Sequence, residues 1–184
     1  MSRLSTRRSI IPMLDPSETP KVRLCRDVER SIEEVHPELR ELFRQLCRAK
    51  EDWPLYLWGD IGSGKTLASL ALCDYCQFAD HITIENLCSN IMDRDRDRDE
   101  MARIQAAKSK LIVLDEIGAR RKTGDLEYSA VIKTLDAQAT KGFGLICISN
   151  IAPKDLYGMF DQRLVSRLVA GTVFNLAGGD RRKK

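Results

Sequence analysis

The stretch GDIGSGKT occupies residues 59–66 of this 184-residue chain. It follows the short apolar run LYLW at 55–58 and leads into LASLALC, which fits the start of a helix. The spacing GxxxxGK[ST] between a strand and a helix is typical of a P-loop, whose backbone N–H groups surround a phosphate. Glycines let this backbone approach the anion closely because they carry no Cβ atom. The motif therefore predicts a phosphate-binding turn at the end of a strand.

We expect three features of this turn to act together on a nucleotide. Lys65 would reach the outer phosphates, the Thr66 hydroxyl would ligate Mg²⁺, and the following helix would direct its positive end at the anion. The predicted nucleotide-binding residues of the turn are Gly59, Asp60, Ile61, Gly62, Ser63, Gly64, Lys65 and Thr66. The alternative, a glycine-rich turn without a ligand, is disfavoured by the flanking strand and helix.

Polar residues follow two further apolar runs. Asp115 and Glu116 end the run LIVLDE, and Asn150 follows GLICIS. Because ligands of parallel sheets collect at the carboxyl ends of the strands, we expect Asp115 to hold Mg²⁺ through water and Glu116 to polarise an attacking water. Asn150 would orient the same water. Taken alone, two solvated acids and a turn-forming asparagine would explain these residues as well.

Two arginines in DQRLVSRL, Arg163 and Arg167, lie four positions apart and so share one helix face. A phosphate cradle within one subunit needs neither of them. One arginine could instead reach the nucleotide of a neighbouring subunit. A solvated arginine face explains the spacing equally well.

The rest of the chain predicts an α/β fold. Apolar runs at 55–58, 81–84, 111–115, 144–149 and 172–176 alternate with helical patterns, and this alternation favours a parallel sheet with helices on its faces. The helix expected after Pro37 carries one apolar stripe. We expect a loose arm with a short helix over residues 1–34, where SIEE at 31–34 has capping-box spacing, and a single core domain over 35–184.

The overall charge balance points to no particular partner. The net charge is only +3, with 30 basic and 27 acidic residues, so any nucleic-acid footprint must be local. The best local candidate, DRDRDRD at 93–99, is better explained as a solvated linker. No apolar run approaches the length that spans a membrane, and the run after Arg7 and Arg8 is too short for an export signal, so we expect a cytoplasmic protein.

In this order along the chain, the motifs resemble those of AAA+ ATPases. More narrowly they are similar to bacterial replicative helicase loaders of the DnaC/DnaI type and to IstB-type transposition helpers, over roughly residues 38–184. GDIGSGKT matches Walker A, LIVLDEIG matches Walker B, Asn150 matches sensor 1, and DQRLVSRLVAGTVFNLAGGDRR looks like the C-terminal pattern of loaders.

The resemblance implies a P-loop NTPase fold of the AAA+/ASCE group. This is a three-layer α/β/α sandwich with a mainly parallel five-stranded sheet and no separate C-terminal helical lid domain. It also implies hydrolysis of Mg-ATP, a nucleotide-dependent homo-oligomer, and single-stranded DNA with a replicative helicase, or a transposase, as partners. By the same resemblance, Arg167 corresponds to the arginine finger, with Arg163 as the second candidate. Arg181 or Arg182 corresponds to the sensor 2 residue. The N-terminal part before the core is short and differs in this from that of loaders, which bind the helicase through an N-terminal domain.

Other classes fit less well. A small-molecule P-loop kinase would need basic residues in a substrate lid and usually lacks the acidic pair at a strand end. A GTPase would need an NKxD motif, which the sequence does not contain. A nucleotide-bound adaptor with negligible turnover is weakened by Glu116.

Overall fold

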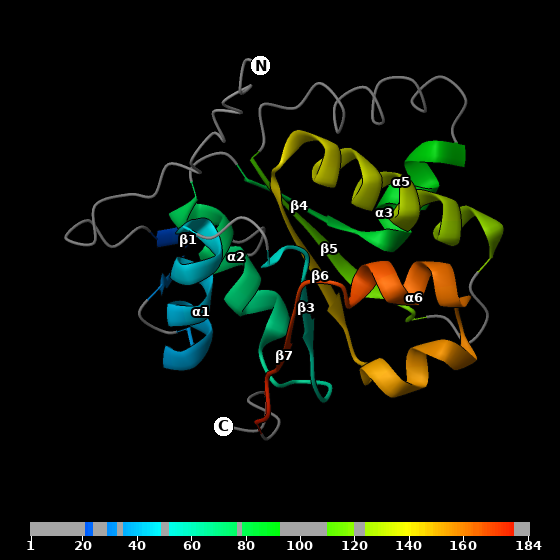
Figure 1. The fold of residues 1–184 in the computed structure, drawn as a ribbon. Helices are drawn as coiled ribbons and strands as arrows, with labels where there is room; N and C mark the ends of the chain where they lie inside the picture. Colours follow the sequence, from blue (N-terminus) through cyan, green and yellow to red (C-terminus); the bar gives the residue numbers. More distant parts are fainter. Residues whose placement is uncertain are drawn as a thin grey trace, which may run out of the picture.

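The computed structural model describes residues 21–23, 29–32, 35–48, 52–76, 79–92, 110–119 and 124–178. Most of the described elements alternate between strand and helix along the chain, as the sequence predicts (Figure 1). They are α1 (Pro37–Arg48), β3 (Leu55–Trp58), α2 (Lys65–Tyr75), β4 (Ala79–Thr83), α3 (Ile84–Met92), β5 (Leu111–Ile117), α5 (Asp125–Lys141), β6 (Gly144–Ser149), η3 (Pro153–Gly158), α6 (Gln162–Leu168) and β7 (Thr172–Asn175).

The central sheet has five strands in the order β4-β5-β6-β3-β7, and all neighbouring strands are parallel. The prediction of a mainly parallel five-stranded sheet is thus confirmed. Strand β6 lies between β3 and β5 although it follows both in the sequence. The segments that follow β3, β5 and β6 therefore leave the sheet at the same edge, next to one another.

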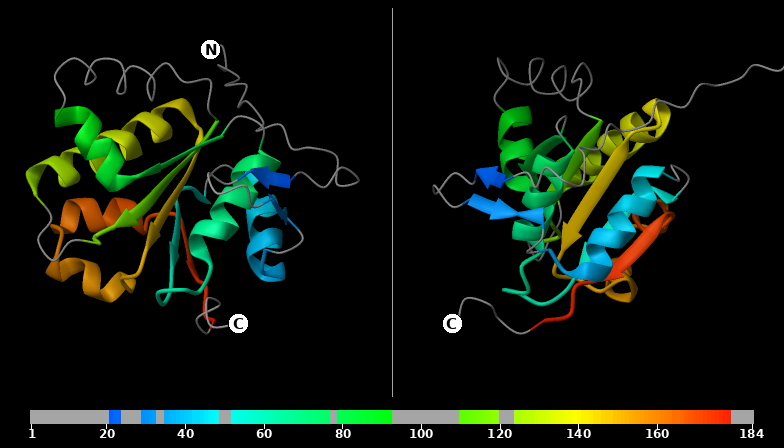
Figure 2. Two further views of the ribbon diagram at one scale, coloured as in Figure 1. Left: turned by 180° about the vertical axis from the view of Figure 1, so that it is seen from behind. Right: turned by 90° about the vertical axis from the view of Figure 1, so that its left-hand side faces the viewer.

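Helices cover both faces of the sheet, which gives the expected three layers. Helices α1 and α2 pack on one face, whereas α3, α5, η3 and α6 pack on the other (Figures 1 and 2). Side chains of β3, of β6 and of residues 111–114 of β5 alternate between the two layers. In β3, for example, Leu55 and Leu57 face α1 and α2, and Tyr56 faces the opposite layer. This pattern explains the continuous apolar runs of β3, β5 and β6, because both faces of these strands are largely buried, whereas the edge strands β4 and β7 are partly exposed.

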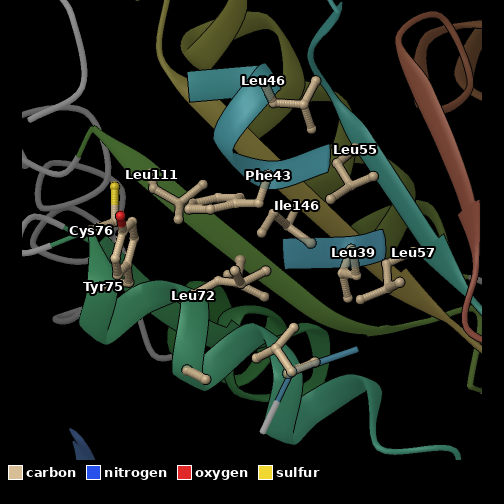
Figure 3. Close-up of a cluster of buried hydrophobic side chains, with 14 of the residues drawn as sticks. Leu39, Phe43, Leu46, Leu55, Leu57, Leu72, Tyr75, Cys76, Leu111 and Ile146 are labelled. Carbon is tan, nitrogen blue, oxygen red and sulfur yellow. The ribbon is translucent and has the colours of Figure 1, made fainter. Parts of the chain in front are cut away.

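Figure 3 shows the core between the sheet and the first helical layer. Leu39, Phe43 and Leu46 of α1 are almost fully buried, and they form one cluster with Leu72 of α2 and with the strand residues. The apolar stripe predicted for the helix after Pro37 is therefore the face that α1 packs on the domain. Burial of such a leucine or phenylalanine stabilises the fold by about 1.5–3 kcal/mol each.

The N-terminal part differs from the expectation. Strands β1 (Lys21–Arg23) and β2 (Glu29–Ser31) pair in an antiparallel arrangement that the sequence did not predict. Ser31 ends β2, and Ile32 directly after it lies in a 3-10 helix, in keeping with the capping-box spacing. The pairing with β1 engages the backbone of β2, and a local pattern cannot reveal such a partner. Residues 1–20, 24–28 and 33–34 lie outside the described residues, as does the DRDRDRD stretch.

The last strand runs beside the P-loop strand. The N–H of Leu176 donates to the carbonyl of Trp58 (2.7 Å), so the chain passes the start of the P-loop just after β7. Between β7 and Gly178, where the described residues end, no helical lid is present. None of the described helices combines the length and the apolar character that a membrane-spanning helix needs.

Candidate functional site

The P-loop joins β3 to α2 through a backbone that only glycine adopts easily. Gly62 and Gly64 have φ values of 84° and 95°, in the left-handed region. Gly64 immediately precedes α2, and no side chain caps the N-terminus of this helix. The first N–H groups of α2 therefore remain available to an anion, and the helix dipole favours a negative charge there.

Lys65 is held at this turn by the loop itself. Its Nζ atom donates to the carbonyls of Gly59 (2.9 Å) and Asp60 (2.8 Å) and lies 3.3 Å from Ser63 Oγ. The residue is 6% exposed. A buried ammonium group within the turn supplies the positive charge that phosphate oxygens require.

The second motif meets the first at Thr66. Its Oγ1 atom donates to Asp115 Oδ2 at 2.8 Å, across 49 residues of sequence. Thr66 is the second residue of α2 and is exposed, whereas Asp115, near the end of β5, is only 2% exposed. A hydroxyl and a carboxylate oxygen are donors that Mg²⁺ prefers, and the ion is usually completed by phosphates and water. The two residues fit a magnesium ion at this point.

A histidine that the sequence did not single out also contacts Asp115. His81 Nε2 lies 3.3 Å from Asp115 Oδ2 and forms an ion pair when the ring is protonated. Burial raises the pKa of the Asp115 carboxyl, but the His81 ring, the Thr66 hydroxyl and the N–H of Glu116 together lower it below its ordinary value. The carboxylate is consequently ionised at neutral pH, as a cation ligand must be.

Glu116 has an unusual backbone. It is exposed, and its φ of 65° makes it the single non-glycine residue with positive φ in the part of the chain that the structure describes. Such a conformation costs about 1–2 kcal/mol because the Cβ atom approaches the carbonyl oxygen. Its N–H donates to Asp115 Oδ1 (2.8 Å), and its carbonyl accepts from the N–H of Ala119 (3.1 Å). Strained residues of this kind cluster at functional sites.

Asn150 follows β6 and is exposed at the same edge. Its neighbours are firmly held. Ser149 Oγ donates to the carbonyl of Ile117 (2.7 Å) and accepts from the N–H of Ile151 (3.1 Å), while the Tyr56 hydroxyl donates to the carbonyl of Ile151 (2.9 Å). The order of the sheet thus places Asn150 between the P-loop and the acidic pair.

The two arginines lie on α6, which belongs to the opposite layer. Arg163 is exposed, and Arg167 forms an ion pair with Asp136 of α5 in the same chain. Tyr128 of α5 also donates to Asp161 (3.1 Å), which caps α6. The predicted helix is present, but within one chain Arg167 has an intramolecular partner. Arg181 and Arg182 lie outside the described residues.

The structure is similar to several solved proteins of DNA replication. It matches the DnaC helicase loader with a TM-score of 0.66 and 15% identity, over 79% of this chain and 96% of that one. DnaI matches with a TM-score of 0.63 and 14% identity, over 75% and 82%. The replication initiator DnaA bound to AMPPCP and single-stranded DNA matches with a TM-score of 0.64 and 17% identity, over 79% and 47%. This chain therefore spans about half the length of that DnaA structure.

No protein-family model matches the sequence, and no curated protein is similar enough to match it. At these levels of identity the likeness concerns the fold. The chain has a three-layer α/β fold with a P-loop and a five-stranded parallel sheet between two helical layers. This fold is similar to that of the DnaC helicase loader and of DnaI.

The positive φ of Glu116 predicts an unusual order of stability. Glu116→Gly is expected to exceed Glu116→Ala in free energy of unfolding by about 1 kcal/mol, because glycine has no Cβ to strain the left-handed backbone. Urea unfolding of the full chain measures the difference. Lys133, exposed within α5, is the control, since there glycine should be less stable than alanine by about 0.5–1 kcal/mol. If glycine is less stable than alanine at both positions, the backbone of Glu116 is not strained.

Proposed function

We propose that the protein binds Mg-ATP at the P-loop and hydrolyses it. The observation that carries this proposal is the hydrogen bond between Thr66 and Asp115, which joins the two motifs at one point of the sheet edge. If the glycine-rich turn and the acidic residues occurred in the chain by chance, we would not expect a hydrogen bond between them. In our proposal Lys65 contacts the outer phosphates, and Thr66 and Asp115 hold the magnesium ion, which would neutralise charge on the phosphates.

The proposed reaction is attack of water on the terminal phosphorus. Glu116 accepts the proton of the water, a bond forms between the water oxygen and the phosphorus, and the bond to the bridging oxygen breaks to release ADP. Asn150 would orient the water beside Glu116. Exposure of both side chains at the edge of the sheet is consistent with these roles. A small-molecule kinase would instead exclude water and transfer the phosphoryl group to a substrate.

For the biological role, we propose a loader of a replicative helicase. The protein would assemble in the cytoplasm as an ATP-dependent homo-oligomer on single-stranded DNA and act on the helicase. The support is the fold likeness to the DnaC helicase loader and to DnaI, together with the DnaA structure bound to AMPPCP and single-stranded DNA. A transposition helper would share the ATP site and differ in the protein that it acts on.

The chemistry is tested by separating binding from turnover. Lys65→Ala is expected to lose ATP binding, whereas Glu116→Gln should keep ATP affinity and lose about 100-fold or more in turnover, because only the proton acceptor is removed. A fluorescent ATP analogue reports binding, and phosphate release reports turnover. Glu41→Gln, the same change at an exposed position of α1, is the control. Full turnover in Glu116→Gln would refute the assignment.

DNA binding is expected to depend on both ATP and salt. Fluorescence anisotropy with a labelled single-stranded oligonucleotide should show binding by the ATP-bound protein that weakens as salt rises, because counterions are released from the phosphates. The Lys65→Ala protein serves as the control, since it should bind no better with ATP than without it. Absence of ATP-dependent binding at low salt would remove the main support for a loader.

Arg167 is expected to complete the active site of a neighbouring subunit. Arg167→Ala should keep folding and ATP binding while turnover falls about 10³-fold or more, because an arginine supplied in trans stabilises the transferring phosphoryl group. Mixing this variant with Lys65→Ala should restore part of the activity. At a mixed interface, the intact P-loop of the Arg167→Ala chain meets the intact Arg167 of the Lys65→Ala chain.

The mixing experiment needs proof that mixed oligomers form, for example by crosslinking of differently tagged chains. If they form and remain as inactive as their components, Arg167 has no role in trans. Arg163 then takes its place in the same experiment, because it lies one helical turn away and is exposed.

A further inference from the structure

The turn that begins in the last residues of β5 is held by residues outside the proposed phosphate site. Residues 116–119 form a turn in which Glu116 and Gly118 both have positive φ, of 65° and 72°. Gly118 is buried, and its N–H donates to Oε1 of Glu127 at 2.9 Å. The residue that fixes this turn therefore belongs to α5, in the layer opposite α2.

Glu127 is an unusual residue to find buried. It is 6% exposed, and carboxylates are rarely so buried unless a partner requires it. It lies in the first turn of α5, where the helix dipole favours its negative charge. Asp125 shares that turn and that benefit, but it is exposed. The feature that distinguishes Glu127 is its hydrogen bond to Gly118.

The other side of the turn is fixed by β6 and the segment that follows it. The carbonyl of Ile117 accepts from Ser149 Oγ (2.7 Å), and a Cβ atom on Gly118 would lie 2.6 Å from Ile151 Cδ1. The turn is thus clamped between α5 and the residues on either side of Asn150. With Ile117 and Gly118 both fixed, the backbone of Glu116 has little freedom to leave its strained conformation.

We propose that Glu127 is a positioning residue for ATP hydrolysis: by holding the N–H of Gly118, it keeps the Glu116 carboxylate aimed at the attacking water. The inference rests on the hydrolysis proposed above. The groups proposed to bind Mg-ATP are held by contacts of their own, Lys65 by the carbonyls of Gly59 and Asp60, and Asp115 by Thr66 and His81. Loss of the Glu127 acceptor should therefore lower kcat and leave ATP affinity unchanged, which a general loss of structure would not do.

Three variants of Glu127 and one control separate the possibilities. Glu127→Met has similar length but no strong acceptor, and Glu127→Asp keeps the charge at the helix N-terminus while shortening the reach by one methylene. Both are expected to lower kcat by about tenfold or more, with ATP affinity within about twofold of the unchanged protein. Glu127→Gln retains an acceptor oxygen and should keep most of the activity. Asp125→Ala removes a charge from the same turn and should have no effect.

Two further measurements complete the test. In a Glu116→Gln background, Glu127→Met should cause no additional loss of turnover, because the group that it positions is already disabled. Hydrogen exchange of the peptide covering residues 116–119 should accelerate in Glu127→Met and Glu127→Asp but not in Asp125→Ala.

The outcomes distinguish this inference from the proposed function. Unchanged kcat in Glu127→Asp and Glu127→Met overturns the positioning role, as does an equal loss of kcat and ATP affinity or a further loss in the Glu116→Gln background. Full turnover in Glu116→Gln alone overturns the proposed role of Glu116, and absence of ATP turnover in the unchanged protein overturns the proposed hydrolysis. The exchange experiment needs no turnover, and unchanged exchange in both Glu127→Met and Glu127→Asp shows that Glu127 does not hold the turn.

Discussion

The parallel pairing of β3, β6 and β5 is the constraint on which the whole site depends. It brings the ends of three strands to one edge, although the P-loop, the acidic pair and Asn150 are separated by dozens of residues in the sequence. Because β6 lies between β3 and β5, the contact between Thr66 at the start of α2 and Asp115 of β5 spans the end of β6. The hydrogen bond of 2.8 Å between Thr66 and Asp115 shows that the P-loop and the end of β5 lie close enough to act on one ligand.

The same edge stores its strain in one place. The motif Asp115–Glu116 needs one acid directed at Thr66 and the next directed at solvent, within two consecutive residues. The chain achieves this by turning Glu116 into the left-handed region, where the Asp115 carboxylate accepts the Glu116 N–H. A cost of about 1–2 kcal/mol is small beside the burial of β5. The strain therefore persists because the buried strand and the clamped turn determine the backbone on both sides.

The sequence predicted the elements that carry their own pattern. Strands at 55–58 and 144–149 occur at the predicted residues, because each is a short apolar run bounded by turns. The strand expected at 81–84 instead spans Ala79–Thr83, since Ala79 and Asp80 pair with β5 despite weak intrinsic preference, and Ile84 begins α3. Boundaries that depend on a partner strand cannot be read from local composition.

The site shows the same division. The P-loop and the acidic pair were identifiable because their spacing alone encodes their chemistry. His81 and Glu127 were not, because each belongs to the site only through its contact with a residue on a different element. His81 reaches Asp115 only because β4 pairs with β5 so that both side chains share a face, and Glu127 reaches Gly118 only through the packing of α5. A single histidine or glutamate in a sequence carries no sign of such a partner.

The ion pair between Arg167 and Asp136 bears on whether this arginine can serve another subunit. Its side chains are 36% and 55% exposed, and an ion pair so accessible to water stabilises a protein by about 0–1 kcal/mol. An arginine that contacts the transferring phosphoryl group accelerates hydrolysis about 10³–10⁵-fold, or roughly 4–7 kcal/mol. Breaking the intramolecular pair would thus offset only a small part of that gain. Asp136 can hold Arg167 at the surface of a separate chain without preventing its transfer to a neighbour's nucleotide.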